Sequence, residues 1–244
     1  MSSAPPQYLE IEAVLRGEVN KLAPNSVLPT EVQLSKRFNV SRITIRRALE
    51  MLEQSGLISR QRGRGTIVSP PKILRRFSPL LSFEHDLRDQ GIDFETRMIA
   101  RDFNADPPEF IRDRLNLSAK KKVAYVAFSR LVEDRIICTD SRYIHPDVAC
   151  QLDPEFLESG DTSRVVEKAV GKKITSADWE SEIIPCAGAA AGVLGIAPGA
   201  LVVANTFTYF LSNGTAAEAG VMSYRVDRCK FQFGGTFNEP MATE

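Results

Sequence analysis

Residues 28–68 constrain the fold more than any other part of the sequence, because they encode two short helices with almost no chain between them. Thr30 is predicted to cap the first helix, with Gln33 at the capping-box position. After a two-residue turn, Ser41 is predicted to cap a second helix, and Gly56 is placed to end it in the left-handed conformation. The sequence therefore predicts a small helical unit in which so short a turn restricts the angle between two helices.

The second of these helices is followed by a predicted β-hairpin. Residues 57–59 and 66–68 read as short strands around the Gly/Arg-rich turn at 61–65. The glycines allow the backbone to turn sharply and to approach a phosphate or a minor groove, and the arginines supply positive charge. An amphipathic helix over residues 8–22 precedes the whole unit and adds an apolar face to it.

A helix-turn-helix with a following hairpin favours DNA binding. The second helix of such a motif enters the major groove, and its N-terminal side chains meet base edges. Arg42, Thr44 and Arg46 lie there; arginine can bind guanine through two hydrogen bonds, and threonine can contact thymine or phosphate. Each pattern alone is also found in ordinary helical domains and solvated turns. The residues predicted to bind DNA are Thr30, Ser41, Arg42, Thr44, Arg46, Arg62, Gly63, Arg64, Gly65 and Thr66.

The distribution of charge supports the same interpretation. The 244 residues contain 31 Lys and Arg and 31 Asp and Glu, so the net charge is zero. Residues 1–76, however, hold 13 basic and 6 acidic side chains, a net charge of +7, and residues 77–244 have a net charge of −7. Such asymmetry indicates a nucleic-acid or membrane partner for the basic part.

Nothing in the composition indicates a membrane, a metal or a cofactor. The first twelve residues lack both the basic and the apolar region of a signal peptide, and the apolar stretch 186–204 is interrupted by glycine and proline. We therefore expect a cytoplasmic protein without a membrane partner. The cysteines have no CxxC spacing, so we expect buried free thiols and no metal site. They are Cys138, Cys150, Cys186 and Cys229.

A Pro-containing basic linker is predicted at residues 69–78, and a second domain at 79–244. Helical patterns there alternate with strands, and two pairs of strands are joined by short turns typical of hairpins. We expect an α+β domain on an antiparallel sheet. The predicted helices cover residues 82–90, 107–115, 163–170 and 187–194. The predicted strands cover residues 94–103, 123–131, 136–144, a segment containing Trp179, 201–211 and 216–226.

The second domain contains no catalytic motif. There is no phosphate-binding glycine loop, no GxSxG and no HExxH. His85 is expected on the surface of a helix and His145 in a turn, so we assign both a structural or solvated role. No catalytic residue is predicted.

Residues 28–68, LPTEVQLSKRFNVSRITIRRALEMLEQSGLISRQRGRGTIV, closely resemble the winged-helix domain of the GntR family of bacterial transcription regulators. The resemblance extends over LPTE, VSR.T.RRAL, the LE..GL element and GRGT. It implies that Arg42 and the backbone at Gly63 contact DNA. The family often has a second operator-contacting arginine where this chain has Val32, which implies an altered operator sequence.

Residues 79–235 resemble the UTRA effector-binding domain, which would place the chain in the HutC subfamily. The similarity rests on LSFEHDLRDQG, FSRLVEDRIICTDSRYI, AAGVLGIAPGALV and EAGVMSYRVDRCKF. UTRA domains bind small molecules and have a fold similar to that of chorismate lyase. The resemblance implies an effector pocket formed by Ser82, Arg130, Asp140, Ser163, Glu218 and Tyr224.

The chemistry of these pocket residues suits a small polar ligand. Arg130 can bind a carboxylate or phosphate through two hydrogen bonds, and Asp140 and Glu218 can accept from hydroxyls or a cationic nitrogen. Members that bind phosphosugars carry a second arginine where this chain has Val132, and commonly an aromatic residue at Val165. We therefore expect a small polar effector with one carboxylate, with or without an amine or a heteroaromatic ring.

These observations predict a ligand-responsive transcription regulator, expected to be a repressor. A homodimer would match a palindromic operator, because a two-fold protein fits a two-fold site. Effector binding would favour one arrangement of the domains and so change operator affinity. Two other functions remain open at this point: a chorismate-lyase-like enzyme tethered to DNA, and an architectural DNA-binding protein without an effector.

Overall fold

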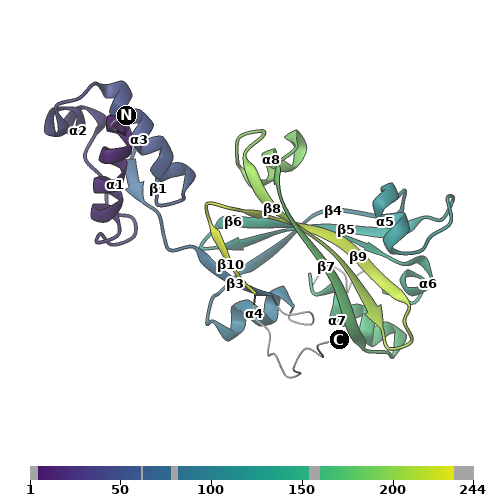
Figure 1. Cartoon of the computed structure of the whole chain (residues 1–244). Helices are drawn as coiled ribbons and strands as arrows, with labels where there is room; N and C mark the ends of the chain where they lie inside the picture. Colours follow the sequence, from purple (N-terminus) through teal and green to yellow (C-terminus); the bar gives the residue numbers. More distant parts are fainter. Residues whose placement is uncertain (1–4, 62, 78–81, 154–159, 234–244) are drawn as a thin grey trace, which may run out of the picture. The chain divides into compact units, whose positions relative to one another are not determined.

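The structure, a computed structural model, divides the chain into two compact units (Figure 1). The first unit runs to Ile73 and also includes Val226–Lys230; the second comprises Leu74–Arg225 and the chain from Phe231 onward. The α+β class expected from the sequence is confirmed. The structure describes residues 5–61, 63–77, 82–153 and 160–233.

Three helices and a hairpin form the first unit, in the order expected. Its core consists of apolar side chains from all three helices and both strands, and Leu34 and Ile45 at its centre are fully buried. The first helix ends at Val19, three residues earlier than predicted. The elements are α1 (Gln7–Val19), α2 (Glu31–Phe38), α3 (Arg42–Gln54), β1 (Ile58–Gln61) and β2 (Gly65–Val68).

The predicted caps of α2 and α3 are confirmed. The Thr30 hydroxyl accepts from the Gln33 backbone N–H, and the Gln33 side chain accepts from the Thr30 N–H at 2.8 Å, which completes the capping box. The Ser41 hydroxyl accepts from the Thr44 N–H at 3.2 Å. Gly56 follows α3 with φ +76°, the conformation for which a glycine was expected. Local side-chain chemistry therefore sets both ends of the helix-turn-helix.

A six-stranded antiparallel sheet, in the order β4-β5-β6-β9-β8-β7, forms the second unit (Figure 1). Two three-stranded meanders are joined where β6 pairs with β9. The strands are β4 (Glu95–Ala105), β5 (Val123–Val132), β6 (Arg135–Ile144), β7 (Ile174–Pro185), β8 (Leu201–Leu211) and β9 (Ala216–Arg225). The helices are α4 (Phe83–Asp89), α5 (Glu109–Arg114), α6 (Pro146–Ala149), α7 (Thr162–Val170) and α8 (Gly188–Leu194).

Helices cover both faces of this sheet (Figure 1). On one face, α5 packs through Ile111 near Ala219, and α8 packs through Leu194 against Val202. The opposite face carries α7, whose Val166 belongs to the same buried cluster as Phe128 of β5. The side chains of this second face form the polar site described below.

The residues predicted as a linker, 69–78, contain a strand that the sequence analysis did not foresee. β3 (Ile73–Phe77) pairs with β10 (Cys229–Phe233) in a separate two-stranded sheet. Because the partner strand lies about 150 residues further along the chain, no local pattern could have indicated the pairing. Residues 78–81, at the end of the predicted linker, lie outside the described residues.

The expectation of four buried thiols is wrong for one cysteine. Cys138, Cys186 and Cys229 are buried free thiols, as expected, but Cys150 is exposed. Cys150 directly follows the short helix α6, where the chain turns at the surface. No sequence pattern had indicated this helix of four residues.

Truncation of Ile45 should destabilise the first unit. Ile45→Ala deletes a fully buried side chain from α3 and is expected to cost about 2–5 kcal/mol, whereas Ile45→Val should cost about 0.5–1.5 kcal/mol. Hydrogen exchange of the α3 amides, followed by mass spectrometry, measures the loss of stability in this unit alone. Equal protection in Ile45→Ala and the unsubstituted chain would contradict this packing.

Candidate functional site

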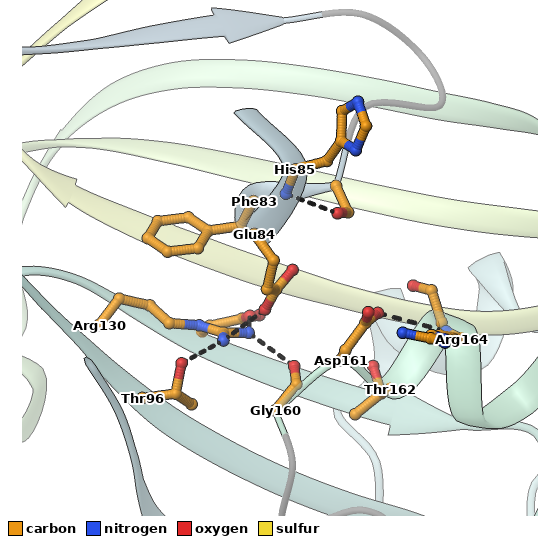
Figure 2. Close-up of polar contacts among 12 residues, drawn as sticks. Phe83, Glu84, His85, Thr96, Arg130, Gly160, Asp161, Thr162 and Arg164 are labelled. Atoms are coloured by element: carbon orange, nitrogen blue, oxygen red, sulfur yellow. Dashed lines mark hydrogen bonds and ion pairs between the residues drawn. The ribbon is translucent and has the colours of Figure 1, made fainter. Parts of the chain in front are cut away.

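Arg130 lies at the centre of a buried polar cluster in the second unit (Figure 2). Its Nη1 donates to Glu84 Oε1 at 2.6 Å and to Thr96 Oγ1 at 2.7 Å. Its Nη2 donates to Asp140 Oδ2 at 2.7 Å and to the Gly160 carbonyl at 2.9 Å. Both terminal nitrogens of this guanidinium are thus engaged by residues of the chain itself.

A second buried arginine, Arg142, extends the cluster across the sheet. Its Nε donates to both Asp140 oxygens, at 2.9 and 3.0 Å, and its Nη1 donates to Glu218 Oε1 at 2.5 Å. The same nitrogen reaches the hydroxyls of Thr162 at 2.9 Å and Ser163 at 3.3 Å, at the beginning of α7. Arg142 therefore connects three predicted pocket residues, Asp140, Ser163 and Glu218.

Burial and pairing act in opposite directions on the ionisation of these carboxyls. Burial alone would raise the pKa of Asp140, but Arg142 and Arg130 outweigh it and hold this pKa below its usual value. For Glu218 burial prevails over the attraction of Arg142, and the pKa is raised. Its Oε2 is buried without a hydrogen-bond partner among the described residues. Glu218 Oε2 can therefore accept a hydrogen bond from a further donor.

Two glycines make room for the cluster. Gly160 has φ +80°, and a Cβ there would lie 2.5 Å from Thr96 Cγ2 and 2.9 Å from Arg130 Nη1. In β9, a Cβ at Gly220 would lie 2.7 Å from the ring of Phe207. Because Gly220 has no side chain, the Phe207 ring fits over β9 and packs beside the Arg142 guanidinium, with its centroid 5.1 Å from Arg142 Cζ.

A second ionic cluster adjoins the first at α4. Arg75 of β3 pairs with Asp86 of α4, and Arg76 Nε donates to the same carboxylate at 2.9 Å. Arg75 also reaches the Tyr224 hydroxyl at 3.5 Å. The ring of Phe83 lies between the clusters, with its centroid 4.5 Å from Arg75 Cζ and 5.0 Å from Arg130 Cζ. The helix α4 is therefore held by β3 on one side and by Arg130 on the other.

The predicted pocket residues divide between these positions. Arg130, Asp140, Ser163 and Glu218 share the first cluster, and Tyr224 lies in the second. The Ser82 hydroxyl caps α4 by accepting from the His85 N–H at 3.1 Å (Figure 2). The sequence analysis missed Arg142, Glu84, Thr96 and Thr162. Arg142 lies two residues after Asp140 in β6, and this spacing, which places both side chains on one face of a strand, was the available indication for it.

The N-terminal turn of α3 presents the predicted DNA-binding side chains. Arg42 is exposed and forms no hydrogen bond or ion pair with any described residue. Arg46 is held by Glu31 of α2, with nitrogen–oxygen distances of 3.2 and 3.4 Å. Arg60 of β1 lies 3.8 Å from the same carboxylate, a contact that the sequence analysis did not foresee. Glu31 therefore orients two cations beside the free Arg42.

The hairpin turn has the predicted geometry. Gly63 and Gly65 both have φ +82°, and a Cβ at either would meet no described atom within 4 Å, so a positive φ rather than crowding favours glycine at both positions. Arg64 is exposed and Thr66 is half-buried in β2. Arg62 lies outside the described residues, so its predicted role stays a prediction.

The described residues contain no helix that is long and apolar enough to cross a membrane. Within the same part of the chain, no three His, Cys, Asp or Glu side chains are grouped so as to hold a metal ion. His85 is exposed on α4, and His145 precedes α6, where its Nδ1 accepts from the Asp147 N–H at 3.2 Å. Both histidines therefore lie where the sequence analysis expected them.

A helix-turn-helix with a hairpin in one unit, and a sheet domain with a buried polar site in the other, define a two-domain regulator that binds DNA. The sequence profile described as "Bacterial regulatory proteins, gntR family" matches residues 7–68, and the UTRA domain profile matches residues 89–230. The chain belongs to the GntR family of bacterial transcription regulators and carries a UTRA domain.

Relatives and solved structures agree with this assignment. The HTH-type transcriptional repressor NagR of Bacillus subtilis (strain 168) is 31% identical over 229 residues, which cover 93% of each chain. The HTH-type transcriptional regulator TreR of the same organism is 28% identical over 73% of this chain and 74% of its own. The crystal structure of PhnF from Mycobacterium smegmatis has the same fold, with a TM-score of 0.61 and 19% identity. The match covers 93% of this chain and 100% of the PhnF chain.

The raised pKa of Glu218 predicts a measurable pH dependence of stability. The folded chain holds this proton more tightly than the unfolded chain does, so stability should fall as the pH rises from the usual 4.5 through the raised pKa. Glu218→Gln removes the titrating group. As the pH rises over this range, the stability of the variant should therefore increase relative to that of the unsubstituted chain. Urea unfolding from pH 4 to 8 measures the difference. A difference that does not change with pH would contradict the assignment.

Proposed function

We propose that this chain is a ligand-responsive repressor that acts in the cytoplasm and binds a palindromic operator as a homodimer. The observation that carries this proposal is the combination, in one GntR-family chain, of a free arginine at the start of α3 and a buried ionic site in the UTRA domain. A two-fold dimer would place two α3 helices on two half-sites. We assign residues 1–68 to DNA binding and residues 79–244 to effector binding and dimerisation, with 69–78 as their connection.

The operator contacts would come from three parts of the first unit. The capped N-termini of α2 and α3, at Thr30 and Ser41, can direct backbone N–H groups toward phosphates. Arg42, Thr44 and Arg46 would face the major groove. The hairpin would supply Arg62, Gly63, Arg64, Gly65 and Thr66 to a phosphate or a minor groove.

Arg42→Ala should weaken operator binding by about 1–3 kcal/mol, because a bidentate contact to guanine would be lost. Fluorescence anisotropy or a gel shift with a duplex selected by the unsubstituted protein measures the change. Arg97→Ala is a matched control, since Arg97 is an exposed arginine of β4, paired with Glu95, in the other unit. Unchanged binding by Arg42→Ala would contradict the assignment.

The effector would bind at the buried cluster around Arg130. In the structure the carboxylate of Glu84 occupies one side of this guanidinium, at 2.6 Å, and Glu84 belongs to α4 rather than to the sheet. A ligand with one carboxylate could take the place of Glu84 on Arg130 with little change in the charge of the site. A second acidic group would find no further free terminal nitrogen on Arg130. An amine of the ligand could donate to the unpartnered Glu218 Oε2.

Displacement of Glu84 would act on α4, and this suggests how binding is transmitted. The same helix holds Arg75 and Arg76 of β3 through Asp86. β3 begins at Ile73, the last residue of the N-terminal segment of the first unit. A ligand that favours one position of α4 would therefore favour one conformation of the connection between the units.

Calorimetric titration of the full chain tests this effector class. We expect binding of a monocarboxylate that carries an amine or a heteroaromatic ring, and weaker binding of sugar phosphates. Glu84→Gln removes the competing carboxylate and should strengthen binding of the same acid by about tenfold, the magnitude of one charge-assisted hydrogen bond. Glu95→Gln, at an exposed ion pair of β4, is the control. Tight binding of a sugar phosphate without binding of any monoanionic acid would contradict the proposal.

A further inference from the structure

Ile43, the second residue of α3, is an apolar residue whose side chain is exposed. It is 69% exposed, and no large apolar side chain among the described residues is more exposed. Four other apolar residues of α3, Ile45, Ala48, Leu49 and Leu52, are buried in the core of the first unit. Single apolar side chains on a surface are common. The significance of Ile43 therefore depends on what surrounds it.

Most neighbours of Ile43 on α3 already have partners within the chain. Arg46 is held by Glu31, and the Arg47 guanidinium lies over the ring of Tyr8, 5.8 Å from its centroid. The Thr44 hydroxyl lies 2.9 Å from the Ser41 hydroxyl. Arg42 alone among the polar side chains of this turn forms no contact of this kind with the described residues. The turn thus leaves two adjacent groups unengaged, a cation and a branched hydrocarbon.

This pair of groups matches one feature of the major groove. The C5 methyl of thymine is the apolar group that base pairs present there, whereas guanine presents the O6 and N7 acceptors that suit arginine. The sequence had suggested Thr44 for the thymine contact, but the Thr44 side chain is half-buried and its hydroxyl is engaged. Ile43 presents a branched apolar side chain that is already exposed before binding and can pack on such a methyl group.

We propose that Ile43 determines operator specificity by packing against the C5 methyl of a thymine, next to the base or phosphate that Arg42 contacts. The inference rests on the proposed binding of α3 in the major groove. An exposed isoleucine gives no advantage to the free protein, whereas burial of the methyl group and the side chain together favours the complex. Asparagine or arginine at this position would instead read adenine or guanine.

The test uses the full chain and a duplex that it selects from a random library. Each thymine is replaced in turn by deoxyuridine, in both half-sites at once, which removes only the methyl group. Anisotropy titration should find one position at which the unsubstituted protein loses about fourfold in affinity per half-site, the value of one buried methyl. Ile43→Ser should bind the original duplex more weakly and should show no further loss at that position.

Val14→Ser is the matched control, because Val14 is an apolar residue of α1 that is 48% exposed. This variant should keep both the affinity and the sensitivity to deoxyuridine, and circular dichroism confirms that both variants are folded. Normal operator binding with no methyl-sensitive position, or an equal loss at that position in Ile43→Ser, would overturn this inference alone. Failure of the unsubstituted protein to select any duplex would overturn the proposed function as well.

Discussion

Two buried arginines on neighbouring strands, Arg130 of β5 and Arg142 of β6, are the constraint to which the sheet domain is adapted. A buried charge costs several kcal/mol unless it is paired and hydrogen-bonded. Besides Asp140 of β6, which pairs with both arginines, the described partners come from five other elements or segments: α4, β4, β9, the chain at Gly160 and the first turn of α7. Their packing on one face of the sheet is therefore fixed by charge as well as by apolar contact.

The same constraint makes the site suited to a switch. Arg130 must always have an acid beside it, and in the mode of binding that we propose the acid from α4, which does not belong to the sheet, is replaced by one from a ligand. An exchange of one carboxylate for another leaves the buried charges balanced, so the two states can lie close in free energy. A site that bound its ligand by simply adding a charge would not have this property.

In the DNA-binding unit the charged groups are arranged in the opposite way, at the surface. The pairs of Glu31 with Arg46 and with Arg60 are partly exposed, and such pairs contribute little to stability. They can orient the arginines before binding and can be exchanged for phosphates at low cost. The rigid part of this unit is its apolar core, and the surface formed by α3 and the hairpin is left to the partner.

The sequence by itself determined whatever depends on near neighbours in the chain. The caps at Thr30 and Ser41, the left-handed Gly56 and the hairpin glycines were all predicted and confirmed, because each depends only on residues a few positions apart in the chain. The strands were predicted from the alternation of apolar residues for the same reason, because this pattern also depends on near neighbours in the chain. The tertiary structure alone decided which charges meet. Arg142 meets Glu218 across 76 residues, and β3 meets β10 across about 150, because burial brings distant segments together and obliges each buried charge and each buried backbone group to find a partner.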